Sequence, residues 1–382
     1  MNISARALVI RDRFQENFEQ RGELGASLSV WHGTDEKISL AGGFCDRERR
    51  ASWSAETMVL IWSATKGLSA ACLLHACQQR GIPFSSPVVA IWPEFGANGK
   101  DEITIGHVVT HQAGLPALSK EVSVFDYPAV IAALVNERPV WPPGTAHGYH
   151  PRTYGFLLDE MVRRLTNGVT LARYWQRIFA EPLQLDLFIG VDQQSAATIA
   201  PVFAPHAAPT HDNPFYRALA TPGSLPARAF SSPGGLRRIS EVNSIAARTG
   251  GFPAFGGIGT ARSLAKFYAM LANGGRWGER IFFAEPVSDL LRAAEVDGPD
   301  LVLQTQSAFA AGFMRDPLDS AGKKQRAIFG PSVTGFGHPG AGGCHAFADP
   351  SSGVAFAYLM NQMEPGIFPG EKCMRLIDAL YA

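Results

Sequence analysis

The pattern of hydrophobic and polar positions predicts strands near both ends of the chain and helices between them. The chain opens with an amphipathic, charged segment that runs to about Glu19, which is typical of a surface helix. Residues 63–250 show helical patterns joined by long loops. Strand patterns lie at 26–33, 37–43, 276–283, 307–313 and 353–360, and a closing helix is expected over 369–381.

Helices and strands at both ends indicate an antiparallel sheet assembled from the two termini, with the helical region as an insertion. We therefore expect an α/β protein of the α+β type. Its sheet domain would comprise residues 1–62 and 251–382, and a mostly helical domain would comprise residues 63–250. The 382 residues, 46% of them hydrophobic, suffice for one large domain or two intertwined ones.

Charge and composition exclude several classes of protein. The formal net charge is zero and no run of like charges occurs, so we expect no nucleic-acid partner. No apolar segment is long enough to span a bilayer and the first residues do not resemble a signal peptide, so we expect a cytoplasmic protein with no membrane partner. The five cysteines are scattered, and buried reduced thiols are expected.

The stretch Ser63-Ala64-Thr65-Lys66 is the first candidate for chemistry. Residues three apart on a helix are neighbours on one face, so the Lys66 amine can reach the Ser63 hydroxyl. A serine hydroxyl is a weak nucleophile until a base takes its proton. A lysine can be that base only if burial or a nearby positive charge lowers its pKa. Free N–H groups at a helix start suit a developing oxyanion. Taken alone, however, the pattern favours a capping serine and a solvated lysine.

A tyrosine motif further along the chain favours the catalytic interpretation of Ser63 and Lys66. Tyr149 follows the turn Trp141-Pro-Pro-Gly144 and precedes a helical stretch over 153–165. By itself it fits an ordinary half-buried tyrosine. Within reach of Ser63 and Lys66, its phenol would serve as a proton shuttle. Tyr154 is the alternative, ranked lower because the turn directly introduces Tyr149.

A glycine-rich run at 336–343 is the third motif. It contains His338, Gly340 and Ala341 and leads to the apolar strand pattern at 353–360. Glycines allow the backbone to approach a ligand closely. A strand edge at this point could supply a second oxyanion donor. The purely structural alternative for His338 is that it caps a turn.

The three motifs, in this order, resemble those of the serine β-lactamase and penicillin-binding-protein superfamily, and most of all the class C β-lactamase-related esterases called family VIII carboxylesterases. The Ser-x-x-Lys motif falls on Ser63 and Lys66, and the Tyr-x-Asn motif falls on Tyr149, with Pro151 where asparagine is usual. The Lys-Thr-Gly motif, often His-x-Gly in esterases, falls on 338–340. The segment 103–116, with its His-Gln-Ala-Gly-Leu-Pro ending, matches a further hallmark. The resemblance covers about residues 20 to 380.

The resemblance implies a β-lactamase/transpeptidase-like fold with the active site between the two domains. It implies a serine esterase that takes small-molecule esters with short acyl chains and needs no cofactor. Ser63 would form an acyl-enzyme, and Lys66 and Tyr149 would move its proton to the leaving alcohol. The N–H groups of Ser63 and Ala341 would form the oxyanion hole. His338 and Gly340 would line the substrate site.

Several alternatives stay open at this stage. The same scaffold could serve a β-lactamase, a D-amino-acid peptidase, an acyltransferase to an alcohol acceptor, or a catalytically silent binding protein. His338 in place of lysine reduces the fixed positive charge that would attract a substrate carboxylate. Pro151 removes the asparagine that would bind an amide, so both departures favour esters. The physiological substrate, the acyl chain length and the oligomeric state stay open, a homo-oligomer included.

A metal site is not expected. The best candidate cluster, at His206, His211 and Asp212, lies in a loop rich in Pro and Ala with no further ligand close in sequence. The pair His107 and His111 has a spacing that can bind zinc on a helix, but no glutamate lies between them. We expect His111 to be a structural residue beneath the site.

Overall fold

The computed structural model describes residues 3–207, 212–284, 289–290 and 295–382. An antiparallel sheet of eight strands forms its base, in the order β2-β1-β13-β12-β11-β10-β9-β8. Its strands are β1 (Gly25–His32), β2 (Asp35–Gly43), β8 (Val296–Pro299), β9 (Gln306–Ala310), β10 (Phe313–Arg315), β11 (Phe336–Pro339), β12 (His345–Asp349) and β13 (Val354–Met360). The two termini therefore build one sheet, as the sequence predicts: β1 pairs with β13 from Ala26↔Met360 to His32↔Val354.

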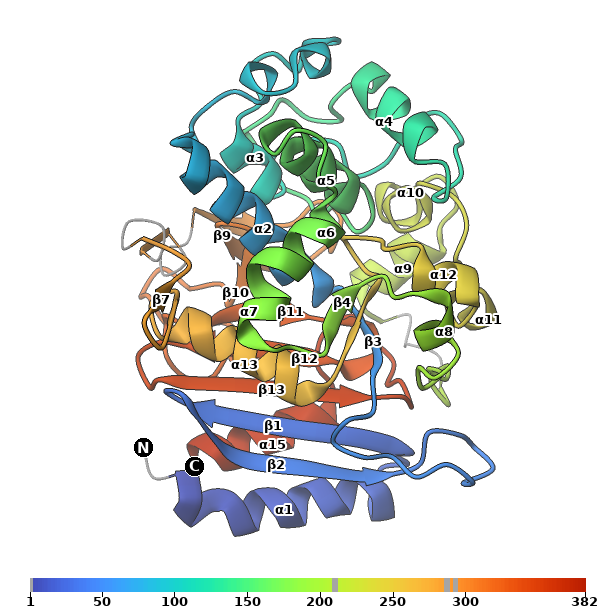
Figure 1. The fold of residues 1–382 in the computed structure, drawn as a ribbon. Helices are drawn as coiled ribbons and strands as arrows, with labels where there is room; N and C mark the ends of the chain where they lie inside the picture. Colours follow the sequence, from blue (N-terminus) through green and yellow to red (C-terminus); the bar gives the residue numbers. More distant parts are fainter. Residues whose placement is uncertain (1–2, 208–211, 285–288, 291–294) are drawn as a thin grey trace.

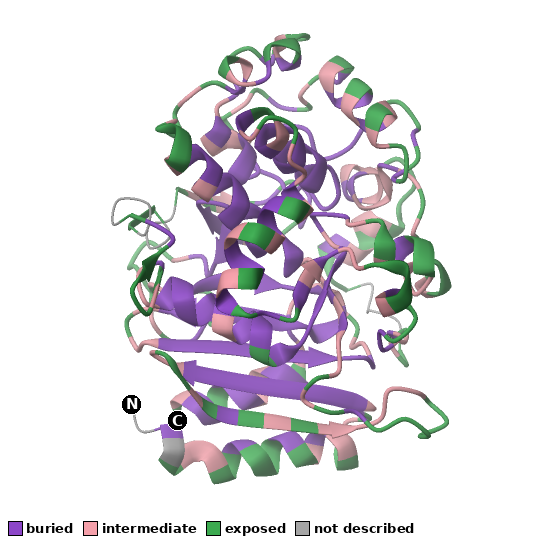
Figure 2. Cartoon of the chain, viewed as in Figure 1, coloured by how far each residue is buried: buried purple, intermediate pink, exposed green. Residues whose placement is uncertain are grey.

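Helices cover both faces of this sheet. Figure 1 shows α1 (Ile3–Gln20) and α15 (Glu371–Tyr381) packed together on one face, with α13 (Ala261–Ala272) on the other. Strands β1 and β13 are consequently buried along almost their whole length, and Figure 2 shows them as buried strands in the lower part of the view. The prediction of an antiparallel sheet flanked by the N- and C-terminal helices is confirmed.

The remaining helices lie mainly in the middle of the sequence, and in Figure 1 they stand above β13, β1 and β2. They are α2 (Thr65–Arg80), α3 (Ile105–Val109), α4 (Tyr127–Asn136), α5 (Thr153–Leu165), α6 (Leu171–Trp175), α7 (Glu181–Leu183), α8 (Gln193–Ala196), α9 (Pro214–Ala220), α10 (Leu225–Ser231), α11 (Ile239–Val242) and α12 (Ile245–Thr249). The domain boundaries at 62/63 and 250/251 stay a prediction. None of the described helices has the length and apolarity needed to cross a membrane.

The structure differs from the prediction at two of the expected strands. The segment 307–313 is not one strand, because Ala311 and Gly312 have positive φ angles of 48° and 90° and turn the chain between β9 and β10. The segment 276–283 forms only the hairpin of β6 (Arg276–Trp277) and β7 (Arg280–Ile281), which lies outside the main sheet.

A second, three-stranded sheet was not expected. It joins β3 (Val59–Trp62), β5 (Gly257–Gly259) and β4 (Leu187–Ile189), and β4 lies within the region predicted to be helical. Strands of three or four residues are too short to give a periodic pattern, and pairing with distant segments decides their conformation.

The cysteine prediction is correct for four of the five residues. All five thiols are free. Cys45 is only partly buried, and the fully buried ones are Cys72, Cys77, Cys344 and Cys373.

The helix that follows the Ser63 turn is fixed by tight packing. From Thr65 to Leu74 every residue of α2 is buried, and the helix packs on α5. A Cβ atom on Gly67 would lie 2.5 Å from the Tyr268 hydroxyl, so only glycine fits there. At its far end, α2 stops at Gly81, whose φ of 64° is the left-handed conformation that commonly terminates a helix.

Candidate active site

Ser63 lies in the turn between β3 and α2. Trp62, the last residue of the strand, has a φ of 51°, an uncommon conformation for a bulky residue. The Thr65 hydroxyl ties the turn together, since it donates to Trp62 O at 2.5 Å and accepts from Gly257 N at 2.8 Å. The N-cap position of α2 is Ala64, with no side-chain cap. Ser63 is therefore not a capping serine, and its hydroxyl is left for another role.

Lys66 is completely buried one helical turn away from Ser63. Its Nζ lies 3.3 Å from Ser63 Oγ and donates to Pro151 O at 2.9 Å and to Ala254 O at 2.8 Å. No carboxylate among the described residues forms an ion pair with it. Burial alone holds the pKa of the Lys66 amine well below its usual value. The alternative of a solvated lysine is thus wrong.

Tyr149 lies against the same amine. Lys66 Nζ is 4.7 Å from the centre of the phenol ring, and Tyr149 is only 5% exposed. Burial raises the pKa of the phenol, while the nearby Ser63 hydroxyl lowers it to a smaller extent. Tyr149 is therefore a neutral hydroxyl. The alternative, Tyr154, directs its hydroxyl to Gly312 O at 3.4 Å and away from this group.

His338 faces the hydroxyl of Tyr149 from β11. Its Nδ1 lies 2.8 Å from Pro339 O, and because a carbonyl only accepts, Nδ1 carries the proton and Nε2 is unprotonated. That Nε2 lies 3.5 Å from the Tyr149 hydroxyl. Burial is the main cause that lowers the pKa of His338 to about 3. His338 is thus an uncharged acceptor at the position where the related motif carries lysine.

The backbone N–H groups of Ser63 and Ala341 have no acceptor among the described residues, and both residues border the same pocket. Ala341 begins a short 3₁₀ turn directly after β11, rather than lying on the strand edge itself. Gly340 allows this approach, because a Cβ atom there would lie 2.5 Å from Ile61 O. Its own N–H donates to Cys344 O at 2.7 Å, so what Gly340 contributes is the absence of a side chain.

A narrow pocket opens beside these groups. It has about 30 Å³ of free volume and is bordered by Ser63, Tyr149, His338 and Ala341. The rest of its wall is uncharged and almost entirely apolar: Phe230, Leu303, Met314, Pro339, Ile367 and Phe368. Such a wall suits small apolar substituents.

A buried carboxylate behind the site was not predicted from the sequence. Asp300 accepts from Tyr149 N at 3.0 Å, from Val302 N and Leu303 N at 2.8 Å each, and from the Ser307 hydroxyl at 2.9 Å. It thus holds both the backbone of Tyr149 and the pocket residue Leu303. A single aspartate in an irregular segment gives no pattern from which this role could have been predicted.

Three histidines surround Tyr149 in the protein interior. The His111 ring lies against the rings of Tyr149 and Tyr154 in tilted contacts, at centroid distances of 5.0 and 4.7 Å. His150 accepts from Leu115 N at 2.9 Å, and burial lowers its pKa to about 3. His147 is also buried.

The metal candidates do not assemble into a site in the described part of the chain. No group of three or more His, Cys, Asp or Glu side chains there could hold an ion. His107 instead completes the N-terminal cap of α3, where its Nδ1 accepts from Thr104 N at 3.3 Å. His211 lies outside the described residues.

Comparison with known proteins agrees with this geometry. Residues 10–372 match the model of the Beta-lactamase family. The chain is 32% identical over 370 residues to the esterase/beta-lactamase LipL of Mycobacterium tuberculosis, covering 94% of this chain and 81% of that protein. A penicillin-binding protein homologue from Caulobacter crescentus superposes with a TM-score of 0.86 at 32% identity, covering 99% and 97% of the two chains. A family VIII carboxylesterase gives a TM-score of 0.86 at 28% identity, over 98% and 96%. The chain belongs to the β-lactamase family and is a serine hydrolase of the esterase/β-lactamase type.

Proposed function

We propose that this enzyme hydrolyses short-chain carboxylic esters through an acyl-enzyme on Ser63. The observation that supports the proposal most directly is the contact of Lys66 Nζ with Ser63 Oγ at 3.3 Å. The other hydrogen-bond partners of Lys66 Nζ are two backbone carbonyl groups, which form a cage around the amine that contains no carboxylate. The names of the similar LipL and family VIII carboxylesterase support the ester class.

The surroundings of Lys66 suit a general base. A neutral amine has two N–H bonds and one lone pair. The carbonyls of Pro151 and Ala254 can accept both N–H bonds, which leaves the lone pair for the Ser63 hydroxyl proton. A protonated amine would carry an unpaired charge in a fully buried position, and burial opposes that.

The acylation step uses these groups to transfer the acyl part of the ester to Ser63. Ser63 Oγ attacks the ester carbonyl carbon while its proton passes to Lys66. The N–H groups of Ser63 and Ala341 stabilise the negative charge that develops on the carbonyl oxygen. When the C–O bond breaks, Tyr149 delivers a proton to the leaving alkoxide and is itself reprotonated from Lys66. The products are a free alcohol and an acyl group on Ser63.

Deacylation uses the same groups with water in place of serine. Water gives its proton to the Lys66 and Tyr149 pair and attacks the acyl carbonyl carbon. Collapse of the intermediate returns the proton to Ser63 and releases a carboxylic acid. Every step uses groups of this chain and water, so we propose no cofactor.

The preference for esters over β-lactams and peptides rests on the pocket. His338 is uncharged because its pKa is about 3, so it presents no fixed cation to a substrate carboxylate. The apolar wall and the small free volume favour short acyl groups. β-Lactam or D-amino-acid peptide hydrolysis and acyl transfer to an alcohol are the competing outcomes on the same serine.

The test compares substrate classes on one preparation. Values of kcat/KM for p-nitrophenyl acetate and butyrate should exceed those for nitrocefin and a D-alanyl-D-alanine peptide, and Ser63→Ala should abolish all of them. Adding a small alcohol during turnover should measure the fraction of acyl transfer. A higher kcat/KM for nitrocefin than for either ester would assign the enzyme to the β-lactamases.

A further inference from the structure

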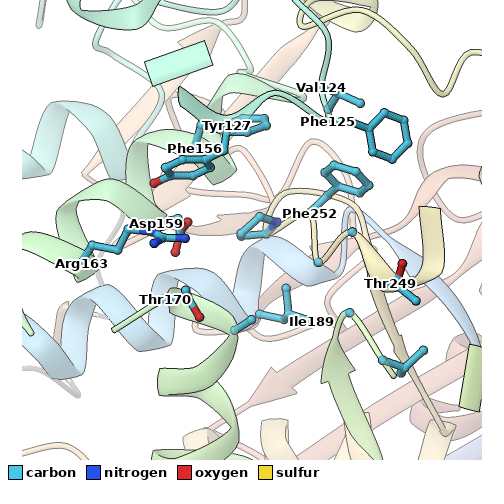
Figure 3. A pocket seen from close by; sticks show the side chains of 16 residues that line it. Val124, Phe125, Tyr127, Phe156, Asp159, Arg163, Thr170, Ile189, Thr249 and Phe252 are labelled. Atoms are coloured by element: carbon cyan, nitrogen blue, oxygen red, sulfur yellow. Dashed lines mark hydrogen bonds and ion pairs between the residues drawn. The ribbon is translucent and has the colours of Figure 1, made fainter. Parts of the chain in front are cut away.

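A second, larger pocket lies away from Ser63. It has about 390 Å³ of free volume, and no residue that lines it also lines the pocket at Ser63. Figure 3 shows it between one face of α5, the loop at 124–127 and the segment 249–253. The mechanism proposed above makes no use of this space.

Aromatic rings form one side of the second pocket. Phe125 and Phe252 meet edge to face with their ring centroids 5.4 Å apart, and they lie together in Figure 3. Phe125 is 51% exposed, which is unusual for so large an apolar side chain. Tyr127 and Phe156 add a second pair, with centroids 5.8 Å apart. This side of the pocket suits the apolar body of a ligand.

An ion pair between Arg163 and Asp159, both of which line the pocket, lies at the other side. Arg163 donates through Nε to Asp159 Oδ2 at 3.0 Å, and its guanidinium lies 4.5 Å from the centre of the Tyr127 ring. Asp159 is itself held by Leu171 N at 2.6 Å. The two terminal nitrogens of Arg163 have no acceptor among the described residues. A guanidinium held in this way presents two parallel N–H groups, which match a carboxylate.

The next acidic residue, Glu160, makes its hydrogen bonds to other side chains. Glu160 accepts from Arg164 Nε at 2.8 Å and from the Tyr127 hydroxyl at 2.9 Å. We propose that the second pocket binds an amphipathic monocarboxylate, with its apolar body against Phe125 and Phe252 and its carboxylate on Arg163.

The floor of this pocket is continuous with the cage around Lys66. Phe252 and Pro253 line the pocket, Pro253 O accepts from the Ser69 hydroxyl at 2.5 Å, and the next carbonyl, Ala254 O, accepts from Lys66 Nζ. The segment has little room on its α5 side, since a Cβ atom on Gly155 would lie 2.5 Å from Ala254 N. Only Pro253 separates Phe252 from Ala254, so a ligand that shifts the backbone of Phe252 also displaces the carbonyl that holds Lys66, and through this connection the pocket acts as a regulatory site.

If the proposed function holds, the ligand shares its carboxylate with the acid that ester hydrolysis releases, but its apolar body is larger than a short acyl group. Binding itself does not depend on that function. Calorimetric titration with 4-phenylbutyrate therefore tests the site separately from any assay of hydrolysis.

The charge test uses two adjacent arginines of α5. Arg163→Gln keeps a donor for Asp159 but removes the guanidinium, and it should weaken 4-phenylbutyrate binding about tenfold or more. Arg164→Gln is the matched control: it removes an equivalent i,i+4 pair, with Glu160, but does not line the pocket, so affinity should stay unchanged. The neutral 4-phenylbutanamide should bind the wild-type protein about tenfold more weakly than the acid.

The space test uses α12. Thr249 lines the pocket and is exposed, so Thr249→Trp should fill the opening and abolish binding. Ala246→Trp, on the same helix but outside the lining, should not. Thermal unfolding of each variant checks that it is folded.

The regulatory link has its own readout. A concentration of 4-phenylbutyrate that just saturates the wild-type enzyme should change kcat for p-nitrophenyl acetate in the wild type and in Arg164→Gln, and should change it much less in Arg163→Gln. Equal affinity in Arg163→Gln, retained binding in Thr249→Trp, or no binding up to about 10 mM probe would each overturn the site. Binding that meets the charge and space tests without any change in kcat would overturn the link to Lys66.

Discussion

Replacing Asp300 should separate the positioning of Tyr149 from the chemistry that Tyr149 performs. The Asp300 carboxylate is 2% exposed and accepts from three backbone N–H groups, of which Tyr149 N is one. In Asp300→Asn, the amide oxygen can keep those three bonds. The new NH₂ group can donate to Ser307 Oγ, whose own proton then goes to His147 Nε2, 2.9 Å away. The variant should therefore fold.

The magnitude follows from the hydrogen bonds. Hydrogen bonds to a charged acceptor contribute about 1.5–3 kcal/mol net against about 0.5–1.5 for neutral ones, so Asp300→Asn should destabilise by about 3 kcal/mol. Asp300→Ala strands three buried donors at about 1–3 kcal/mol each, or about 5 kcal/mol in total. That loss approaches the whole stability of a typical domain, about 5–15 kcal/mol, so Asn is the informative substitution.

The assay is kcat for p-nitrophenyl acetate together with urea unfolding. The neutral amide holds Tyr149 N less firmly than the carboxylate does, and a shift of a catalytic group by about 1 Å can lower a rate about a hundredfold, so Asp300→Asn should reduce kcat by about ten- to a hundredfold. Asp316→Asn is the control. Asp316 is another buried carboxylate that accepts two backbone N–H groups, from Ile328 and Phe329, but it has no hydrogen bond to Tyr149.

The control should lose stability and keep kcat within about twofold, as expected for a site not coupled to the catalytic group. An Asp300→Asn enzyme that is destabilised yet retains the wild-type kcat would refute the idea that this carboxylate positions Tyr149.

Three further predictions concern the catalytic group itself. Lys66→Ala and Tyr149→Phe should each lower kcat/KM severely, and the double variant should lose little more than either single variant, because the two residues act as a unit. Additive losses in kcat/KM would show that one of them only supports the fold. Lys66 must be neutral to accept a proton, and burial lowers its pKa, so kcat/KM should fall as the pH drops through that lowered pKa, well below the ordinary lysine value of 10.5. A fall in kcat/KM centred near 10.5 would contradict this. His338→Lys should shift the ratio of kcat/KM values toward substrates that carry a carboxylate, and an unchanged ratio would show that His338 does not face that part of the substrate.

The sequence predicts the parts of this enzyme that depend on local pattern. Amphipathic helices and long apolar strands at the termini were identifiable, and α5 begins and ends at the expected residues 153 and 165. The spacing of Ser63 and Lys66 also carries its own geometry, because a helical turn brings positions three apart together whatever surrounds them.

The parts that depend on distant contacts were not predictable. Strands β11 and β12 flank a Gly- and Pro-rich run with poor strand propensity, and pairing with their neighbours in the sheet makes them strands. The cage around Lys66 is built from the main-chain carbonyls of Pro151 and Ala254, and a carbonyl group has no sequence signature. Asp300 acts on Tyr149 from 151 residues away, which no local pattern records.

The most direct test of the central claim is to identify the covalent intermediate. Wild-type enzyme is mixed with excess p-nitrophenyl acetate or butyrate, quenched in acid during turnover, and analysed by intact mass and peptide mapping. We predict one added acyl group per chain, located on Ser63, with no adduct and no hydrolysis in Ser63→Ala, since losing a covalent nucleophile typically lowers kcat by several orders of magnitude. An acyl group on another residue, or a Ser63→Ala enzyme that keeps about a tenth of the wild-type activity, would contradict the account.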